Sequence, residues 1–161
     1  MSSEKSRGLT LKSELRNKKS ATRSAWTAEK EGSRTMSMTF DTLPAAANSD
    51  PEFRITARFW NSTLRLDMGD VPLLIRIEKG QITEVVSGEH AFSLLTPANI
   101  VVSAPAGEWQ KFLERIPKPF YVDLWGATAY HGFKVGGDME SFYAYYPAVR
   151  RLFDIMRALT H

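Results

Sequence analysis

The sequence predicts one α+β domain in which a curved antiparallel or mixed sheet of about five strands is covered on one face by helices. Three observations support this class. Apolar and polar residues alternate through much of residues 53–86, which is the spacing of half-buried strands. From residue 109 onward the apolar spacing becomes i, i+3, i+4, i+7, typical of amphipathic helices. The turns between the first strands are too short for parallel crossovers, so these strands should form an antiparallel meander.

Charge and composition divide the chain into two parts. Residues 1–35 hold nine Lys or Arg and four Glu, a balance of +5, while the whole chain carries +3. This segment has few large apolar residues, which predicts a disordered extension. The segment DTLPAAANSDP at 41–51 has the composition of a linker that a helix does not readily cross. We therefore expect an extension and linker over 1–50 and a folded domain over 51–161.

The basic extension has several possible interpretations. Clustered cations can bind nucleic acid or an anionic membrane surface through counterion release. A solvated extension, or sequence upstream of a start at Met36 or Met38, explains the same composition. We do not expect nucleic acid as a partner, and transient membrane contact through the extension stays open. The sequence does not indicate the oligomeric state.

The first half of the domain is expected to be mostly strands. The alternation changes phase after residue 59, which predicts a bend near residues 61–63. Met68-Gly69-Asp70 and Lys79-Gly80 supply turn residues. The expected strands are 53–59, 60–68, 73–78, 81–86 and 99–104.

The second half is expected to be mostly helical. A helix should begin near Pro105 and carry Trp109, Phe112, Leu113 and Ile116 on one face, with Pro117 ending it. The spacing of apolar residues over 120–130 indicates neither a helix nor a strand. A short strand over 132–137 and helices over 141–146 and 147–159 should follow, and the last helix has a clear apolar face.

The order of elements over residues 53–160 resembles the sterol carrier protein type 2 family of non-specific lipid-transfer proteins. The stretches that carry this resemblance are LRLDMGD turning into LLIRIEKGQITEV, the passage NIVVSAPAGEWQKFL, and FKVGGDMESF before the terminal helix. The family usually has an amphipathic helix directly before its first strand. This sequence shows no obvious one there, and the short candidate at 21–31 lies far upstream.

The resemblance implies an apolar tunnel between sheet and helices that accepts a lipid, fatty acyl or sterol-like ligand. Aromatic side chains are dense between residues 109 and 153, which suits either a ligand cavity or an ordinary packed core. An interaction module with an exposed apolar patch is a further alternative. The residues expected to line the tunnel are Leu73, Ile75, Ile77, Trp109, Phe112, Leu113, Phe120, Trp125, Phe133, Leu152, Phe153 and Met156.

Catalytic motifs are missing from the sequence. It has no cysteine, its three histidines His90, His131 and His161 are scattered, and HExxH, GxxxxGK[ST] and GxGxxG are all absent. We therefore expect neither a metal nor a cofactor. Asp123, Tyr130 and His131 are weak acid–base candidates, which a cyclase- or isomerase-type cavity enzyme would need to bring together.

Two further expectations concern charge and location. Glu108 and Glu114 are expected to be solvated, because their spacing does not place them on a shared helical face. Residues 1–35 lack the apolar core of a secretory signal, and no stretch reaches the ~18 apolar residues of a membrane span. A cytoplasmic location is therefore expected.

Overall fold

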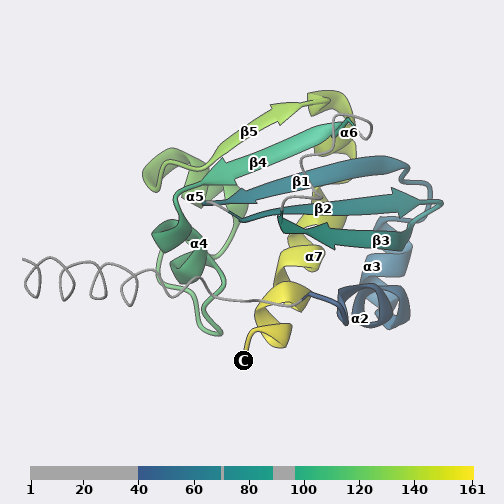
Figure 1. The fold of residues 1–161 in the computed structure, drawn as a ribbon, viewed down its shortest axis with the longest axis horizontal. Helices are drawn as coiled ribbons and strands as arrows, with labels where there is room; N and C mark the ends of the chain where they lie inside the picture. The colour runs from purple at the N-terminus through teal and green to yellow at the C-terminus, as the bar shows by residue number, and fades with distance from the viewer. Residues whose placement is uncertain (1–39, 70, 89–96) are drawn as a thin grey trace, which may run out of the picture. The chain divides into compact units, whose positions relative to one another are not determined.

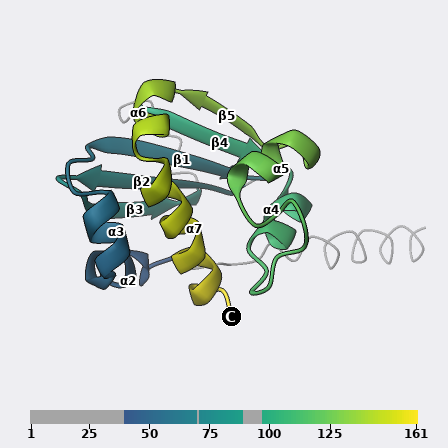
Figure 2. The ribbon, with the colours of Figure 1, turned by 180° about the vertical axis from the view of Figure 1, so that it is seen from behind.

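The computed structural model describes residues 40–69, 71–88 and 97–161. These residues form a five-stranded sheet whose helices all lie on one face (Figures 1 and 2). The strands are β1 (Ser62–Met68), β2 (Val71–Glu78), β3 (Gln81–Ser87), β4 (Ile100–Ala104) and β5 (Lys134–Gly137). The helices are α2 (Leu43–Ser49), α3 (Pro51–Thr56), α4 (Ala106–Phe112), α5 (Leu124–Tyr130), α6 (Met139–Ala144) and α7 (Tyr146–Leu159).

The sheet is mixed, with the strand order β3-β2-β1-β4-β5. The expected meander is present, because β1 pairs antiparallel with β2, and β2 with β3. β4 then pairs with the other edge of β1 in parallel, and β5 adds antiparallel to β4. A parallel pair needs a long connection, and residues 69–99, which contain β2 and β3, join β1 to β4. The predicted class, an α+β fold with about five strands and helices on one face, is confirmed.

The turn between β2 and β3 is a two-residue hairpin that depends on glycine. Lys79 has φ 50° and Gly80 has φ 75°, and positive φ at both positions is the pattern whose twist matches the flanking strands. A side chain on Gly80 would place its Cβ 2.5 Å from the carbonyl oxygen of Ala57. The Gly80 amide also donates to the Trp60 carbonyl (3.0 Å). The hairpin tip is thus held against the chain that follows α3.

The expected linker over 41–51 and the expected strand over 53–59 are both wrong, because these segments are the helices α2 and α3. Pro44 and Pro51 lie in the first turns, where a missing amide breaks no helical hydrogen bond. Asp50 caps α3 by accepting from the Phe53 amide (2.8 Å). Burial then follows helical spacing, since Phe53 and Ala57 are buried whereas Ile55 is 76% exposed.

The folded unit therefore begins earlier than residue 51. Phe40, Leu43 and Ala47 are buried in the same core as the sheet residues. α2 packs beside β3 and α7, and α3 packs on α7. The helical cover that the sequence did not show before its first strand is thus supplied by α2 and α3.

The later helices largely follow the predicted spacing. α4 starts after Pro105 but ends at Phe112, so Ile116 lies beyond it and is 83% exposed. Residues 124–130, which had no assignment, form α5, with Asp123 accepting from the Gly126 amide (2.8 Å). α6 and α7 match the two predicted C-terminal helices to within two residues.

The core is a single apolar layer between the sheet and the helices. α7 crosses the sheet, with α2 and α3 on one side of it and α4 and α5 on the other (Figure 2). Leu73, Ile75 and Ile77 share the face of β2 that points into this layer, whereas Arg76 lies on the opposite face. The apolar stripes of α4 and α7 meet this face, as their spacing predicted.

Candidate functional site

The interior between sheet and helices contains most of the residues that were expected to line a tunnel. Those that are buried in one cluster are Leu73, Ile75, Ile77, Trp109, Phe112, Leu113, Phe133, Leu152, Phe153 and Met156. Two expected residues are placed differently. Phe120 is 52% exposed and Trp125 is 38% exposed, so both lie at the surface around α5.

The cluster is centred on four aromatic rings. The Trp109 ring centroid lies 4.9 Å from that of Phe133, 5.7 Å from that of Phe112 and 6.0 Å from that of Phe153. The Phe112 centroid lies 5.0 Å from that of Phe133 and 5.1 Å from that of Phe153. All five of these pairs are tilted or edge-to-face, which aromatic quadrupoles favour.

The one polar atom of these four rings, the indole nitrogen of Trp109, already forms a hydrogen bond. Trp109 donates its indole N–H to the carbonyl oxygen of Asp67 at the end of β1 (2.8 Å). This bond fixes the ring against the sheet and leaves only carbon surface facing the cluster. These rings can therefore offer a ligand dispersion and apolar contact but no free hydrogen-bond donor.

Arg157 forms the polar boundary of this cluster. Its Nε donates to the Phe112 carbonyl (2.8 Å), Nη2 to the Tyr121 carbonyl (2.9 Å) and Nη1 to the Asp154 carboxylate (2.7 Å). Its guanidinium carbon also lies 4.7 Å from the centroid of the Phe112 ring. Burial lowers the pKa of Arg157 below its usual value. Arg157 thus ties α7 to the end of α4 and to the loop before α5.

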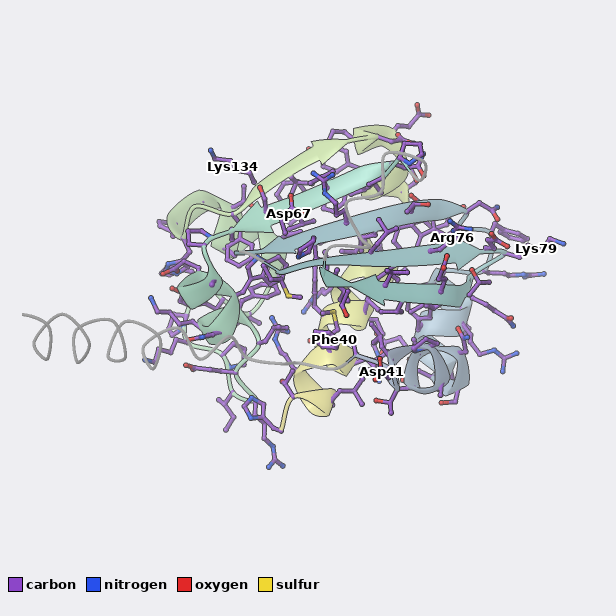
Figure 3. The ribbon with its side chains drawn as sticks, in the orientation of Figure 1. Phe40, Asp41, Asp67, Arg76, Lys79 and Lys134 are labelled. Atoms are coloured by element: carbon purple, nitrogen blue, oxygen red, sulfur yellow. The ribbon has the colours of Figure 1, made fainter. Side chains whose placement is uncertain are left out.

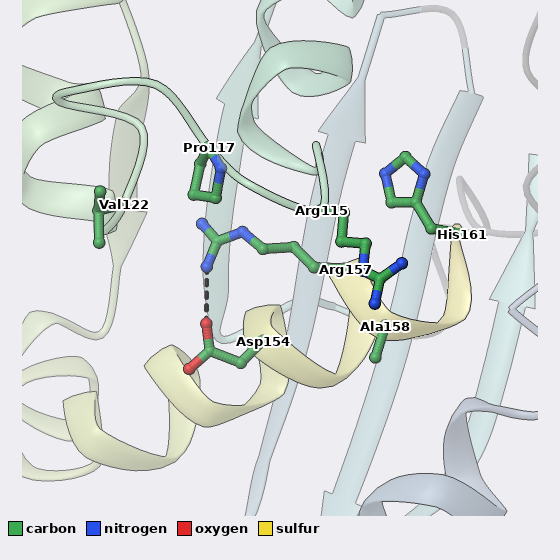
Figure 4. Close-up of a pocket in the computed structure, with 7 residues that line it drawn as sticks. All are labelled: Arg115, Pro117, Val122, Asp154, Arg157, Ala158 and His161. Carbon is green, nitrogen blue, oxygen red and sulfur yellow. Dashed lines mark hydrogen bonds and ion pairs between the residues drawn. The ribbon is translucent and has the colours of Figure 1, made fainter.

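A surface pocket of about 620 Å³ lies on the outer side of Arg157 (Figure 4). Its polar lining contains Arg115, Arg157 and His161 against a single carboxylate, Asp154. Pro117 and Val122 add apolar surface from the loop before α5. This excess of cationic over acidic side chains suits a carboxylate or phosphate group.

The three weak acid–base candidates each have separate partners. Asp123 caps α5, and Tyr130 packs its ring on Phe120 with the centroids 4.2 Å apart. His131 stacks on Tyr121 (3.6 Å between centroids). Asp123 and Tyr130 therefore interact with other residues. The structure does not support a shared acid–base site of Asp123, Tyr130 and His131, which a cavity enzyme would need.

The expectation that Glu108 is a solvated charge is wrong. Glu108 accepts from the Tyr121 hydroxyl (2.5 Å) and from Lys111 Nζ (2.7 Å), and its Oε2 lies 3.7 Å from His131 Nδ1. The hydrogen bond from Lys111 lowers the pKa of Glu108, and burial raises the pKa of Tyr121. Both shifts favour an ionised carboxylate and a neutral phenol at pH 7. We interpret this cluster as a tie between α4 and the α5 region, because catalytic acids and bases usually have pKa values near the working pH.

Sequence reasoning missed both Arg157 and the Glu108–Tyr121 pair. Arg157 lies on the expected polar face of the last helix, and only the loop that folds over it makes it buried. Within 40–69, 71–88 and 97–161, no group of three or more His, Asp or Glu side chains is placed to hold a metal ion. Among the described helices, none has the length and apolarity that a bilayer crossing requires.

The comparisons with known proteins give a fold. No family model and no curated protein matches the chain. The chain is similar to the crystal structure of sterol carrier protein 2, with a TM-score of 0.58 and 19% identity over 73% of this chain and 92% of that chain. It is also similar to the solution structure of a conserved hypothetical protein from Thermus thermophilus, titled as possibly a sterol carrier protein. There the TM-score is 0.56 and the identity 19%, over 73% of this chain and 83% of that one. The fold is thus sterol carrier protein-like, as the sequence resemblance implied.

Proposed function

We propose that the folded part of this chain is a carrier domain that holds a hydrophobic ligand between the sheet and the helices. The observation that carries this proposal is the continuous apolar layer formed by β2, α4 and α7, with the Trp109 ring cluster at its centre. The sterol carrier protein-like fold supports it. The ligand classes are those that the family resemblance implied, namely a lipid, a fatty acyl chain or a sterol-like molecule.

The pocket beside Arg157 favours an acidic lipid among these classes. Phe112 belongs to the ring cluster, and Arg157 both covers its ring and lines the pocket. An apolar tail in the interior could therefore be continuous with a carboxylate or phosphate held by Arg115 and Arg157 at its rim. Burying the tail contributes about 0.8 kcal/mol per CH₂ group. The charged head would stay where it keeps hydrogen-bond partners, which avoids the cost of burying it unpaired.

The ligand must enter by separating groups that now touch. The rings of α4 and α7 would part to admit a tail, in the region where Arg157 joins these helices. Aromatic and methionine side chains can repack around an inserted chain with little loss of apolar contact. On this proposal the affinity for the ligand depends on how much of the apolar contact between α4 and α7 the ligand tail can replace.

The direct test is native mass spectrometry of the gently purified full chain, followed by displacement of a fluorescent fatty acid. We expect a bound small-molecule mass, and stronger displacement by oleate than by methyl oleate. The Arg115→Gln variant should lose this preference for the carboxylate. Arg76→Gln, on the opposite face of the sheet (Figure 3), should keep it. If no bound mass is found and no fatty acid or sterol displaces the probe, the proposal is wrong.

A further inference from the structure

Exposed apolar side chains gather around α5. We call this set the aromatic surface, and its exposed fractions run from 38% at Trp125 to 83% at Ile116. Contiguous apolar patches on soluble proteins often mark interaction sites. The members of the aromatic surface are Ile116, Phe120, Val122, Trp125, Tyr130 and Tyr143.

The aromatic members form two packed pairs. Trp125 stacks on Tyr143 (5.5 Å between centroids, 13° between planes), and Phe120 packs on Tyr130. The backbone of Phe120 runs close to α5, since a Cβ on Gly126, the residue after Trp125, would lie 2.9 Å from the carbonyl oxygen of Phe120. One pair therefore lies between α5 and α6, and the other lies between the loop before α5 and the end of that helix.

Phe120 occupies a strained backbone conformation. Its φ is 68°, in the left-handed region, which costs of order 1–3 kcal/mol for a residue other than glycine. Glycine or asparagine would adopt it at lower cost. The Phe120 side chain is about half exposed, so its burial contributes less to the free energy of folding than a fully buried phenylalanine would. A strained and exposed aromatic residue points to a role in binding.

We propose that the aromatic surface docks on an anionic lipid bilayer, which deepens the carrier function proposed above and rests on it. Over residues 115–143 the cations Arg115, Lys118 and Lys134 are exposed. Of the acids there, Asp123 caps α5, Asp138 caps α6 and Glu140 is exposed. Lys134 points away from the body of the molecule at the start of β5 (Figure 3). Phe, Trp and Tyr flanked by Lys and Arg have the composition of segments that lie at a membrane interface.

The aromatic surface also adjoins the pocket beside Arg157. Val122 belongs to both, and Arg115, next to Ile116, lines the pocket. Docking would therefore bring the pocket to the level of the lipid headgroups, where a carrier exchanges its ligand. A second copy of the chain is a less favourable occupant, because a two-fold contact would bring the same cations of both copies together.

The test uses the full chain and vesicles of phosphatidylcholine with or without phosphatidylserine. The chain has no native cysteine, so an environment-sensitive dye can be attached to an Ala129→Cys variant on the exposed side of α5. We expect a blue shift with phosphatidylserine vesicles. The same dye on Thr83→Cys, which is exposed on β3, should not shift. A shift at position 83 without one at 129 would overturn the proposal.

A matched pair of variants tests the side chains themselves. Phe120→Asn with Val122→Ser should weaken vesicle binding by about tenfold or more, because it removes apolar area that would enter the interface. Asparagine tolerates the left-handed conformation, so folding should be unaffected. Ile55→Ser with Phe59→Ser removes comparable exposed surface on α3 and just after it, and should leave vesicle binding unchanged.

The remaining outcomes also decide the question. Unchanged vesicle binding of the Phe120 and Val122 variant, or lost binding of the control, would overturn the proposal. So would a dimer in analytical ultracentrifugation that the same variant dissociates, in favour of a second copy. Fatty-acid displacement on the single variant Phe120→Asn, which leaves the pocket lining unchanged, separates this proposal from the carrier function. Vesicle docking without any fatty-acid binding would refute the carrier alone.

Discussion

Asp50 and Arg151 form a bidentate ion pair across 101 positions of the chain. Arg151 Nη2 donates to Asp50 Oδ2 (2.6 Å) and Nε to Oδ1 (3.1 Å). The same Oδ1 accepts the Phe53 amide, so one carboxylate both caps α3 and holds it to α7. This single residue therefore converts a local helix start into a tertiary contact.

The Asp50 carboxyl should make folding sensitive to acid. Its hydrogen bonds to Arg151 lower its pKa from 3.8 to about 2. A lowered pKa stabilises the folded state above the unfolded value, and this contribution is lost as the pH falls from about 4 to about 2. The side chain is 14% exposed, so we expect about 1–2 kcal/mol. Urea denaturation of Asp50→Asn should show this loss at pH 7 and little difference near pH 2. Asp41→Asn, which is exposed, is the control.

Arg157→Met should destabilise the fold and loosen the loop before α5. The substitution leaves the carbonyls of Phe112 and Tyr121 without their donor, and an unsatisfied buried group costs about 1–3 kcal/mol. We expect a loss of about 3 kcal/mol in chemical denaturation and faster proteolysis between residues 113 and 123. Arg150→Met, which is exposed on the same helix, should behave like the parent. Equal behaviour of the two variants would contradict the role of Arg157.

Chain truncation should separate the extension from the fold. A variant that starts at Met38 should keep the thermal midpoint of the full chain, because residues 1–37 offer little large apolar surface to bury. A variant that starts at Pro51 should lose several degrees, since it lacks the buried Phe40, Leu43 and Ala47. Differential scanning calorimetry measures both. A large loss already at the Met38 start would refute the first part.

Phe112→Ala tests whether the ring cluster binds ligand. If the interior opens for a lipid, this variant should bind fatty acid more weakly while losing less than the ~3–5 kcal/mol of a packed core phenylalanine. Phe53→Ala is the matched control, because Phe53 is equally buried but lies on α3, across α7 from α4 (Figure 2). Phe53→Ala should lose the full ~3–5 kcal/mol of stability expected for a packed core phenylalanine and should bind fatty acid with unchanged affinity. Full destabilisation by Phe112→Ala, with no lipid binding by the parent, would indicate an ordinary packed core.

Strands and helices were predictable from the sequence where the pattern of apolar residues was long or where short turns joined neighbouring strands. The parity of Leu73, Ile75 and Ile77 identified the inner face of β2, and the stripe on the last helix identified the face of α7. The Lys79-Gly80 turn established the β2–β3 pairing. These features depend on backbone geometry within a few residues, which the sequence reports directly.

Tertiary structure decided what short or distant patterns left open. Seven residues from Phe53 fit a strand and a helix almost equally well, and the cap at Asp50 together with Arg151 selects the helix. The parallel pairing of β4 with β1 likewise joins segments that no local pattern relates.

The sequence by itself determined that this chain has an apolar interior between one sheet face and its helices. The placing of Arg157, Glu108 and Tyr121, and the exposure of Phe120 and Trp125, followed only from how the loop before α5 folds over its neighbours. The physical reason is that periodicity records which side of an element is apolar. Hydrogen bonds between residues far apart in the chain depend on the path of the loops that bring them together.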